Sequence, residues 1–271
     1  MHRRMQGDRP IETEAWGAGD AAPALVVPGG PCRDPEYLGD LAGITEVRPL
    51  VVMHPRGTPR TGGRSRGWWN DAEDLVAIAD ALSLDAVDIV AHSAGTRLAL
   101  AAAARFPDRV RSLLLIAPPA TWLTGTAHDG AILAAQRNEP AVTAAAASMA
   151  APTPTTEAGF QRAIRVEAPA GYARWSDLER AHSSDGGMTL AAALAWFDAI
   201  PDDAVDRVLG AALPDTCVIA GDRDILTGVQ PVRDYARLLE ADLQMLAGCG
   251  HYPWVEQPSA FRDAALGWLG R

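Results

Sequence analysis

The sequence contains no lysine, and all 24 of its basic residues are arginines. This absence excludes chemistry that needs a lysine Schiff base, a lysine-bound pyridoxal phosphate or a P-loop lysine. Cysteine is also scarce. Cys32, Cys217 and Cys249 are widely spaced and odd in number, so they predict neither a metal site nor a disulfide framework. Such cysteine usage fits a reducing compartment.

Long apolar runs and clusters of basic residues are missing too. No stretch of about 18 apolar residues occurs, and the N-terminus lacks the apolar segment of a signal peptide, so we expect a cytoplasmic protein without a membrane span. The formal net charge is −10, and no basic stripe offsets it, which argues against nucleic acid and anionic membrane as partners. The 271 residues are 48 % hydrophobic, which is enough to bury a sizeable core.

Short apolar runs alternate with helical patterns along much of the chain. The predicted strands span residues 24–27, 47–53, 86–91, 113–117, 217–220 and 242–246. The predicted helices between and after them span residues 70–82, 96–106, 232–239 and 260–269. A short hairpin around Gly7 precedes the first of these strands. This alternation predicts an α/β fold with a mostly parallel sheet covered by helices on both faces.

The strand pattern disappears between residues 120 and 213. Helical segments are predicted there at residues 130–139, 141–151, 156–168 and 190–200. We therefore predict a core formed by residues 1–119 and 214–271, with residues 120–213 as a helical lid inserted after the fourth parallel-type strand. Ligands bind such sheets outside the carboxyl ends of the strands, so the residues that follow each strand are the candidates for chemistry.

Ser93 stands between a predicted strand and a predicted helix, in the sequence Ala-His-Ser-Ala-Gly. Small residues at Ala91 and Gly95 allow a tight strand-turn-helix that lifts the serine above the sheet, beside a helix N-terminus. A serine that only caps the helix is the alternative. The strand-turn-helix context favours a nucleophile instead.

A serine nucleophile needs a base, and a base needs an orienting carboxylate. His251 lies in a glycine-flanked loop after the last predicted strand, where a reachable imidazole is expected. The strand that ends near Ala220 is followed by Asp222 and Asp224, of which we choose Asp224 as the catalytic acid. Asp222 is expected to be solvated or paired with Arg223.

Acyl transfer also requires backbone N–H groups that stabilise a developing oxyanion. One donor should be Ala94, the residue after the nucleophile. The other should be Gly30, in the Pro-Gly-Gly-Pro loop after the first buried strand, because a side chain at Gly30 would crowd the substrate. A plain turn is the alternative for this loop.

These residues together resemble the α/β-hydrolase superfamily over nearly the whole chain. The Val-Val-Pro-Gly-Gly-Pro loop, the segment from Arg56 to Ser65 and the serine turn resemble the proline iminopeptidase branch in particular. Pro28 replaces the histidine of that branch's His-Gly-Gly-Pro-Gly loop, Cys32 replaces its last glycine, and His54-Pro55 replaces Asp-Gln. The resemblance implies hydrolysis through Ser93, His251 and Asp224, while these replacements leave peptidase specificity open.

The predicted lid supplies candidate substrate contacts. They are Trp122, Trp175, Trp196 and Glu167. Packing between lid and core explains the tryptophans as well, and a solvated helix face explains the glutamate as well. Cys32 and Cys249 flank the expected site and are interpreted as small buried hydrophobes.

The sequence thus predicts a cofactor-independent serine hydrolase with no metal site, acting on a small-molecule or short-peptide ester or amide. Three alternatives remain open. They are an acyltransferase or thioesterase acting on carrier-bound or natural-product acyl groups, a non-catalytic ligand-binding protein, and a lyase on the same scaffold.

Overall fold

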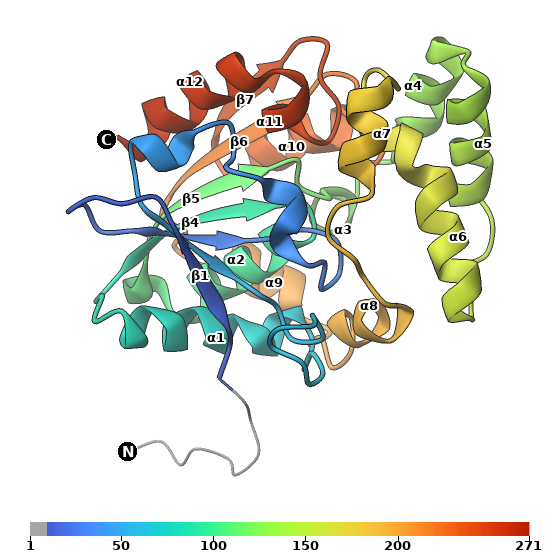
Figure 1. Cartoon of the computed structure of the whole chain (residues 1–271). Coiled ribbons are helices and arrows are strands. Elements are labelled where there is room, and N and C mark those ends of the chain that lie inside the picture. Colours follow the sequence, from blue (N-terminus) through green and yellow to red (C-terminus); the bar gives the residue numbers. More distant parts are fainter. Residues whose placement is uncertain (1–9, 271) are drawn as a thin grey trace.

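The computed structural model describes residues 10–270 of the chain (Figure 1). Within these residues, seven strands form one sheet in the order β1-β3-β2-β4-β5-β6-β7. The strands are β1 (Thr13–Trp16), β2 (Ala24–Val27), β3 (Leu50–Met53), β4 (Val87–His92), β5 (Val110–Ile116), β6 (Asp215–Gly221) and β7 (Asp242–Leu246). Neighbouring strands are parallel except for β1, which pairs antiparallel with β3. The predicted N-terminal hairpin is expected to reach to about Trp16. Its turn at Gly7 lies outside the described residues, and its described part, β1, pairs with β3.

The central strands are buried on both faces, and their side chains alternate between two core layers. Leu25 and Val27 of β2 face the first layer, whereas Ala24 and Val26 face the second. This period-2 alternation is the normal geometry of a strand. Because both faces are covered, the strands read in the sequence as continuous apolar runs.

Helices cover both faces of the sheet. In the first layer lie α1 (Trp68–Ala81), α2 (Gly95–Arg105) and α10 (Gln230–Leu238), and in the second lie α11 (Pro253–Glu256) and α12 (Pro258–Leu269). The short 3₁₀ helices η1 (Pro35–Leu38), η2 (Ile44–Glu46) and η3 (Pro107–Arg109) join these elements. Helix α2 ends just before Pro107, since proline cannot continue a helix. The predicted α/β fold with a mostly parallel sheet is confirmed.

The segment between β5 and β6 is helical throughout its regular structure, as predicted. It contains α3 (Thr121–Thr124), α4 (Gly130–Arg137), α5 (Pro140–Met149), α6 (Glu157–Glu167), η4 (Ala168–Gly171), α7 (Asp177–Ser183), α8 (Leu190–Trp196) and α9 (Ala204–Leu209). Figure 1 shows α4, α5 and α6 as a block beside the sheet. That block has its own small core, which Ile225 of the β6 loop enters.

The two ends of this segment pack differently from its middle. Leu123, Trp196 and Val208 belong to the first core layer, so α3, α8 and α9 are anchored on the main body. The division of the chain at residues 120 and 213 stays a prediction.

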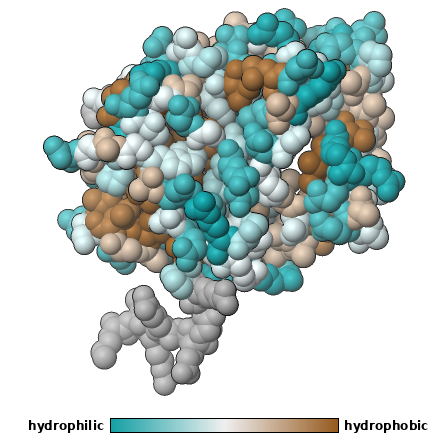
Figure 2. Space-filling view, viewed as in Figure 1, coloured by the Kyte–Doolittle hydropathy of each residue, from teal (hydrophilic) through white to brown (hydrophobic). Residues whose placement is uncertain are grey.

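No helix within residues 10–270 has both the length and the apolar character needed to cross a membrane. Figure 2 shows hydrophobic side chains in separate patches on the face it presents.

Candidate active site

Ser93 occupies a strained turn at the carboxyl end of β4. Its backbone φ is +49°, a left-handed conformation that residues other than glycine rarely adopt. The Ser93 N–H donates to the carbonyl of Ile116 at 2.8 Å, which ties the turn to β5. At Gly95 an added Cβ would lie 2.4 Å from the carbonyl oxygen of Pro28, so only glycine fits there. The turn holds the partly exposed Ser93 above the sheet.

His251 and Asp224 form a buried hydrogen-bonded pair. His251 Nδ1 lies 2.8 Å from Asp224 Oδ2. The carboxylate also accepts hydrogen bonds from the N–H groups of Leu226 at 2.9 Å and Thr227 at 3.2 Å, and from the Thr227 hydroxyl at 2.5 Å. Because a carboxylate only accepts, the imidazole carries its proton on Nδ1 and leaves a lone pair on Nε2.

Asp222 does not reach His251. Its Oδ1 accepts the Gly248 N–H at 2.7 Å and lies 3.8 Å from the Arg223 guanidinium. Asp222 therefore supports the start of the loop that carries His251. Of the two acids after β6, the structure brings Asp224 to the imidazole.

Glu256, which sequence reasoning missed, fixes the His251 loop from the other side. One of its oxygens accepts the N–H of Gly250 at 2.7 Å, and the other accepts the N–H of Ala173 at 2.7 Å. The His251 N–H donates to the carbonyl of Gly171 at 2.8 Å. Burial raises the pKa of Glu256, although these backbone donors oppose the shift. The loop is thus held by the segment that follows η4.

His92 joins the nucleophile turn to the His251 loop. Its Nε2 lies 3.1 Å from the His251 carbonyl oxygen, and the two imidazole rings are 4.7 Å apart between centroids. Burial, together with the neighbouring His251, lowers the pKa of His92 well below its ordinary value, so its ring is neutral. Since a carbonyl only accepts, His92 Nε2 carries the proton and Nδ1 is an acceptor.

Tyr37 completes the connection to the loop after β2. Its hydroxyl lies 2.9 Å from His92 Nδ1 and accepts the Gly29 N–H at 2.5 Å. The hydroxyl therefore donates to His92 and receives from Gly29. A continuous chain of hydrogen bonds runs from the Gly29 loop through Tyr37 and His92 to the His251 backbone.

The two predicted oxyanion donors remain available. Within residues 10–270, neither the Gly30 N–H nor the Ala94 N–H donates to a protein acceptor. The Gly29 N–H is committed to Tyr37, which leaves Gly30 as the donor of this loop. An added Cβ on Gly29 would lie 2.8 Å from Ser93 Cβ, so the loop packs directly against the serine.

Arg33 holds the segment around Gly186 over the loop that contains Gly30. Its guanidinium stacks 4.0 Å from the Tyr37 ring centroid and donates to the Tyr252 hydroxyl at 3.0 Å and the Gly186 carbonyl at 2.9 Å. An added Cβ on Gly30 would lie 3.0 Å from the sulfur of Met188. Residues near Gly186 thus cover the oxyanion loop.

Neither cysteine near the site is suited to act as a nucleophile. Cys32 and Cys249 are buried, at 2 % and 0 % exposure. Burial raises the pKa of the Cys32 thiol to about 12 and also raises that of Cys249. Both thiols therefore stay protonated at neutral pH.

The four predicted substrate contacts lie in different surroundings. Trp122 lies edge-on to Trp68, with ring centroids 5.3 Å apart, beside the first turns of α2. Trp196 is 1 % exposed in the first core layer, and Trp175 packs on Tyr172. Glu167 accepts the Ser148 hydroxyl at 2.8 Å, between α5 and α6. The structure places Trp122 against Arg97 of α2, the helix that follows Ser93, and substrate contact by all four stays a prediction.

Residues 56–65, the segment that resembles proline iminopeptidases, form a buried ion pair and a buried hydrogen bond with α1. Arg56 donates twice to Asp74, at 2.8 and 2.7 Å, and the Ser65 hydroxyl donates to Asp71 at 2.6 Å. Such bidentate pairing is geometrically specific. These residues fasten the segment to α1.

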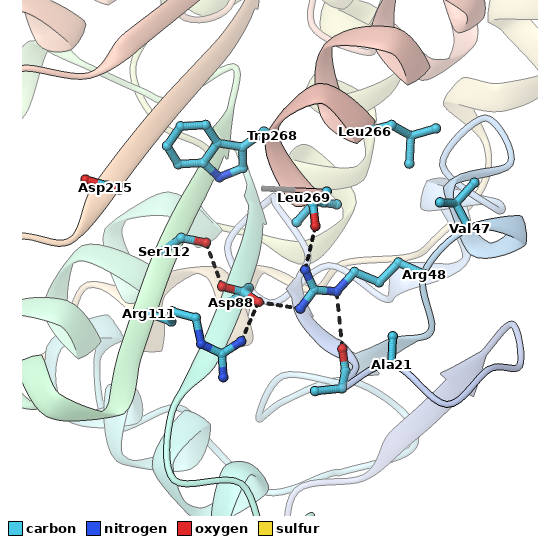
Figure 3. Close-up of a pocket in the computed structure, with 12 residues that line it drawn as sticks. Ala21, Val47, Arg48, Asp88, Arg111, Ser112, Asp215, Leu266, Trp268 and Leu269 are labelled. Atoms are coloured by element: carbon cyan, nitrogen blue, oxygen red, sulfur yellow. Dashed lines mark hydrogen bonds and ion pairs between the residues drawn. The ribbon is translucent and has the colours of Figure 1, made fainter.

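A second polar cluster lies near the amino ends of the central strands, at the opposite end from Ser93 (Figure 3). Asp88 accepts from Arg48, from Arg111 at 2.9 Å and from the Ser112 hydroxyl at 2.8 Å, beside a cavity of about 600 Å³. Arg48 also donates to the Leu269 carbonyl at 2.8 Å. Asp88 and Ser112 stand near the amino ends of their strands, away from the edge where parallel sheets bind ligands. This cluster ties the C-terminal helix to the sheet.

Comparison with known proteins identifies the family. Residues 43–258 match the family described as alpha/beta hydrolase fold, so the chain belongs to the α/β-hydrolase family. Together with hydrolase relatives, this makes it an enzyme of the α/β-hydrolase class.

Three curated relatives are similar to the chain. 2-Hydroxy-6-oxo-2,4-heptadienoate hydrolase of Pseudomonas putida is 27 % identical over 281 residues, covering 93 % of this chain and 90 % of the relative. 2-Hydroxymuconate semialdehyde hydrolase, also of Pseudomonas putida, is 36 % identical over 36 % of this chain and 37 % of the relative. Proline iminopeptidase of Heyndrickxia coagulans is 32 % identical over 37 % of this chain and 36 % of the relative. The last two matches thus span only about a third of each relative.

Solved structures also share the fold. A proline iminopeptidase-related protein of Thermus thermophilus aligns with a TM-score of 0.66 and 22 % identity, covering 97 % of this chain and 94 % of that one. At this identity the likeness concerns the fold alone.

Proposed function

We propose that the protein is a serine hydrolase that cleaves an ester or amide of a small molecule or short peptide without a cofactor. The observation that carries this proposal is the buried Asp224–His251 pair beside the strained Ser93 turn. Acyl transfer by a serine needs a nucleophile, a base and an acid that orients the base. Here the three candidates come from three separate loops. The N–H groups of Gly30 and Ala94, which have no acceptor among residues 10–270, support the same interpretation.

The proposed roles are those of a serine, histidine and aspartate triad. The Ser93 hydroxyl oxygen attacks the substrate carbonyl carbon while its proton passes to His251 Nε2. Asp224 keeps the imidazole in the required tautomer and stabilises its protonated form. The N–H groups of Gly30 and Ala94 bind the oxyanion, each contributing about 3 kcal/mol to the transition state.

Departure of the leaving group completes acylation, and hydrolysis of the acyl-enzyme follows. The leaving alcohol or amine takes the proton from His251 as its bond to the carbonyl carbon breaks, and an acyl-Ser93 ester remains. Water then loses a proton to His251, attacks the ester carbonyl and releases the acid. The proton returns to Ser93. We assign residues 120–213 the role of a lid that selects the substrate.

Two substrate classes have support. The motif resemblance and the 32 % identical relative favour proline iminopeptidase-like cleavage of an N-terminal proline amide. The relative that aligns over 93 % of the chain is a hydrolase of 2-hydroxy-6-oxo-2,4-heptadienoate, which favours a small carboxylate-bearing substrate instead.

An activity panel tests the proposal. The purified enzyme is given aminoacyl-naphthylamides, including the proline amide, short p-nitrophenyl acyl esters and 2-hydroxy-6-oxo-2,4-heptadienoate, with and without an added amine or alcohol acceptor. We expect turnover of at least one of the amides or esters, with water as the acyl acceptor. Turnover of the heptadienoate alone, which has neither an ester nor an amide bond, would contradict the proposal. Transfer of the acyl group to the added acceptor in preference to water would favour the acyltransferase alternative. No turnover of any substrate would contradict the proposal.

A further inference from the structure

Arg97 lies one helical turn beyond the nucleophile, near the start of α2. Side chains on a helix lean toward its N-terminus, so Arg97 extends back toward the Ser93 turn. Its guanidinium carbon lies 4.9 Å from the Trp122 ring centroid and 5.4 Å from that of Phe197. Trp122 follows β5 in α3, and Phe197 directly follows α8. Arg97 therefore lies between the core and the inserted helices, close to the carboxyl ends of the strands.

The Arg97 guanidinium has no hydrogen bond and no ion pair to any residue from 10 to 270. Arg33 and Arg56, which are also at least partly buried, each donate to two or more protein oxygens. Burial lowers the pKa of Arg97 to about 10, so the group still carries its charge at neutral pH. The neighbouring titratable group is Tyr235, whose pKa is raised by burial and which is therefore uncharged. An unpaired, half-buried cation is costly unless another partner is available.

No carboxylate of the described residues lies near the Arg97 guanidinium. The indole Nε1 atoms of Trp122 and Trp68 are both buried and have no hydrogen-bond partner within the described residues. The two rings adjoin each other, with centroids 5.3 Å apart. Contact with aromatic faces also fixes the plane of the guanidinium. Within residues 10–270, the Arg97 guanidinium thus contacts aromatic rings and has no anionic acceptor.

We propose that Arg97 determines specificity by binding a carboxylate of the substrate, so that the enzyme prefers acidic esters or amides. The inference rests on the proposed role of Ser93. A planar guanidinium matches a carboxylate through two parallel hydrogen bonds, which a neutral ester cannot offer with the same strength. Adipate monoesters are suitable probes, because they carry a free carboxylate on a short flexible chain beyond the reacting carbonyl.

Two esters that differ only in charge test the proposal. They are p-nitrophenyl hydrogen adipate, which is anionic, and its neutral methyl ester. We expect the wild-type enzyme to give a higher kcat/KM for the anion, and Arg97→Met to lower the anion-to-neutral ratio roughly 10- to 100-fold. Arg97→Lys keeps the charge but not the planar fork, so its ratio should be intermediate. Arg207→Met is the matched control, because Arg207 lies over Trp69 at 5.8 Å on α9, and its ratio should equal that of the wild type.

Binding to the Ser93→Ala variant separates this inference from the proposed function. Calorimetry with monomethyl adipate and dimethyl adipate should show tighter binding of the anion, and the double variant Ser93→Ala/Arg97→Met should lose that difference. If Ser93→Ala still hydrolyses the esters, the nucleophile assignment fails while the binding difference continues to decide the role of Arg97. An unchanged anion-to-neutral ratio in Arg97→Met, or equal binding of both ligands, would overturn the carboxylate site.

Discussion

His251 Nδ1 lies 2.8 Å from Asp224 Oδ2, and both side chains are almost fully buried. The pair joins two loops that lie 27 residues apart in the chain. With Nδ1 protonated toward the carboxylate, the second nitrogen is left as the base that the proposed mechanism requires.

Replacing Asp224 with asparagine should separate its role from that of Asp222. An amide can donate its N–H to Nδ1 and so favour the wrong tautomer, and we expect kcat to fall by about 10³- to 10⁴-fold. Asp222→Asn is the control, with an expected loss of less than roughly tenfold because Asp222 touches only the loop backbone and Arg223. Steady-state kinetics on a substrate from the panel measure both. Similar losses in the two variants would contradict the assignment of Asp224.

Tyr37→Phe should impair catalysis more than binding. The variant breaks the hydrogen-bond chain that positions the Gly29 loop and His92 around Ser93. We expect kcat to fall roughly 10- to 100-fold with KM nearly unchanged, because small displacements of reacting groups are costly. Tyr172→Phe removes a similar tyrosine–histidine contact, to His182 at 2.6 Å, that takes no part in this chain of hydrogen bonds. An equal loss of kcat in that control would show that only general stability is being measured.

The buried imidazole of His92 should make stability depend on pH. Its pKa is lowered in the folded state, mainly by burial. The unfolded chain therefore binds a proton below pH about 6.5 that the folded chain does not, and stability is lost as the pH falls below that value. The stabilisation that depends on the neutral His92 ring is fully present above pH about 6.5. Below that pH the free energy of unfolding falls by up to about 1.4 kcal/mol for each pH unit.

Urea unfolding at pH 7.5 and pH 5.5 measures this effect. We expect the free energy of unfolding to fall less between the two pH values in His92→Gln than in the wild type. The same pH dependence in both proteins would remove His92 as a source. Other titrating groups are common to both proteins and cancel in the comparison.

The tight packing of the serine turn predicts a strong effect at Gly95. Gly95→Ala places a Cβ against the Pro28 carbonyl and should lower the free energy of unfolding by about 2–3 kcal/mol. Gly267→Ala is the control in α12, where an added Cβ meets no atom within 4 Å. That change should stabilise the protein by about 0.5–1 kcal/mol, because alanine is the better helix former. Denaturant midpoints that do not differ in this direction would contradict the packing account.

Local patterns explain why much of the fold and candidate site could be predicted. The Ser93 turn is encoded within a few residues, by an apolar strand, small neighbours and a helix that ends at a proline. His251 and Asp224 could be found because each follows a strand, and parallel strands bring their carboxyl ends to one edge. The short helices α7 and α9 were missed because each offers fewer than three turns of periodic pattern.

The remaining parts of the site depend on contacts between distant residues. Tyr37 meets His92 from 55 positions away, and Glu256 meets Ala173 from 83 positions away. No local motif around Tyr37 or Glu256 indicates a role in the site, because their partners are determined by how the loops pack. Arg97 could not be singled out from the sequence either, because its lack of an acidic partner among residues 10–270 depends on how the chain folds around it.

Covalent labelling by a fluorophosphonate tests the central claim most directly, since the reagent reacts with an activated serine. Peptide mass spectrometry should find one adduct, on Ser93, in the wild-type protein. The Ser93→Ala variant should keep its fold by circular dichroism, take up no label and hydrolyse none of the esters or amides that the wild type accepts. Labelling of that variant at another residue, or its continued turnover of those substrates, would contradict the account.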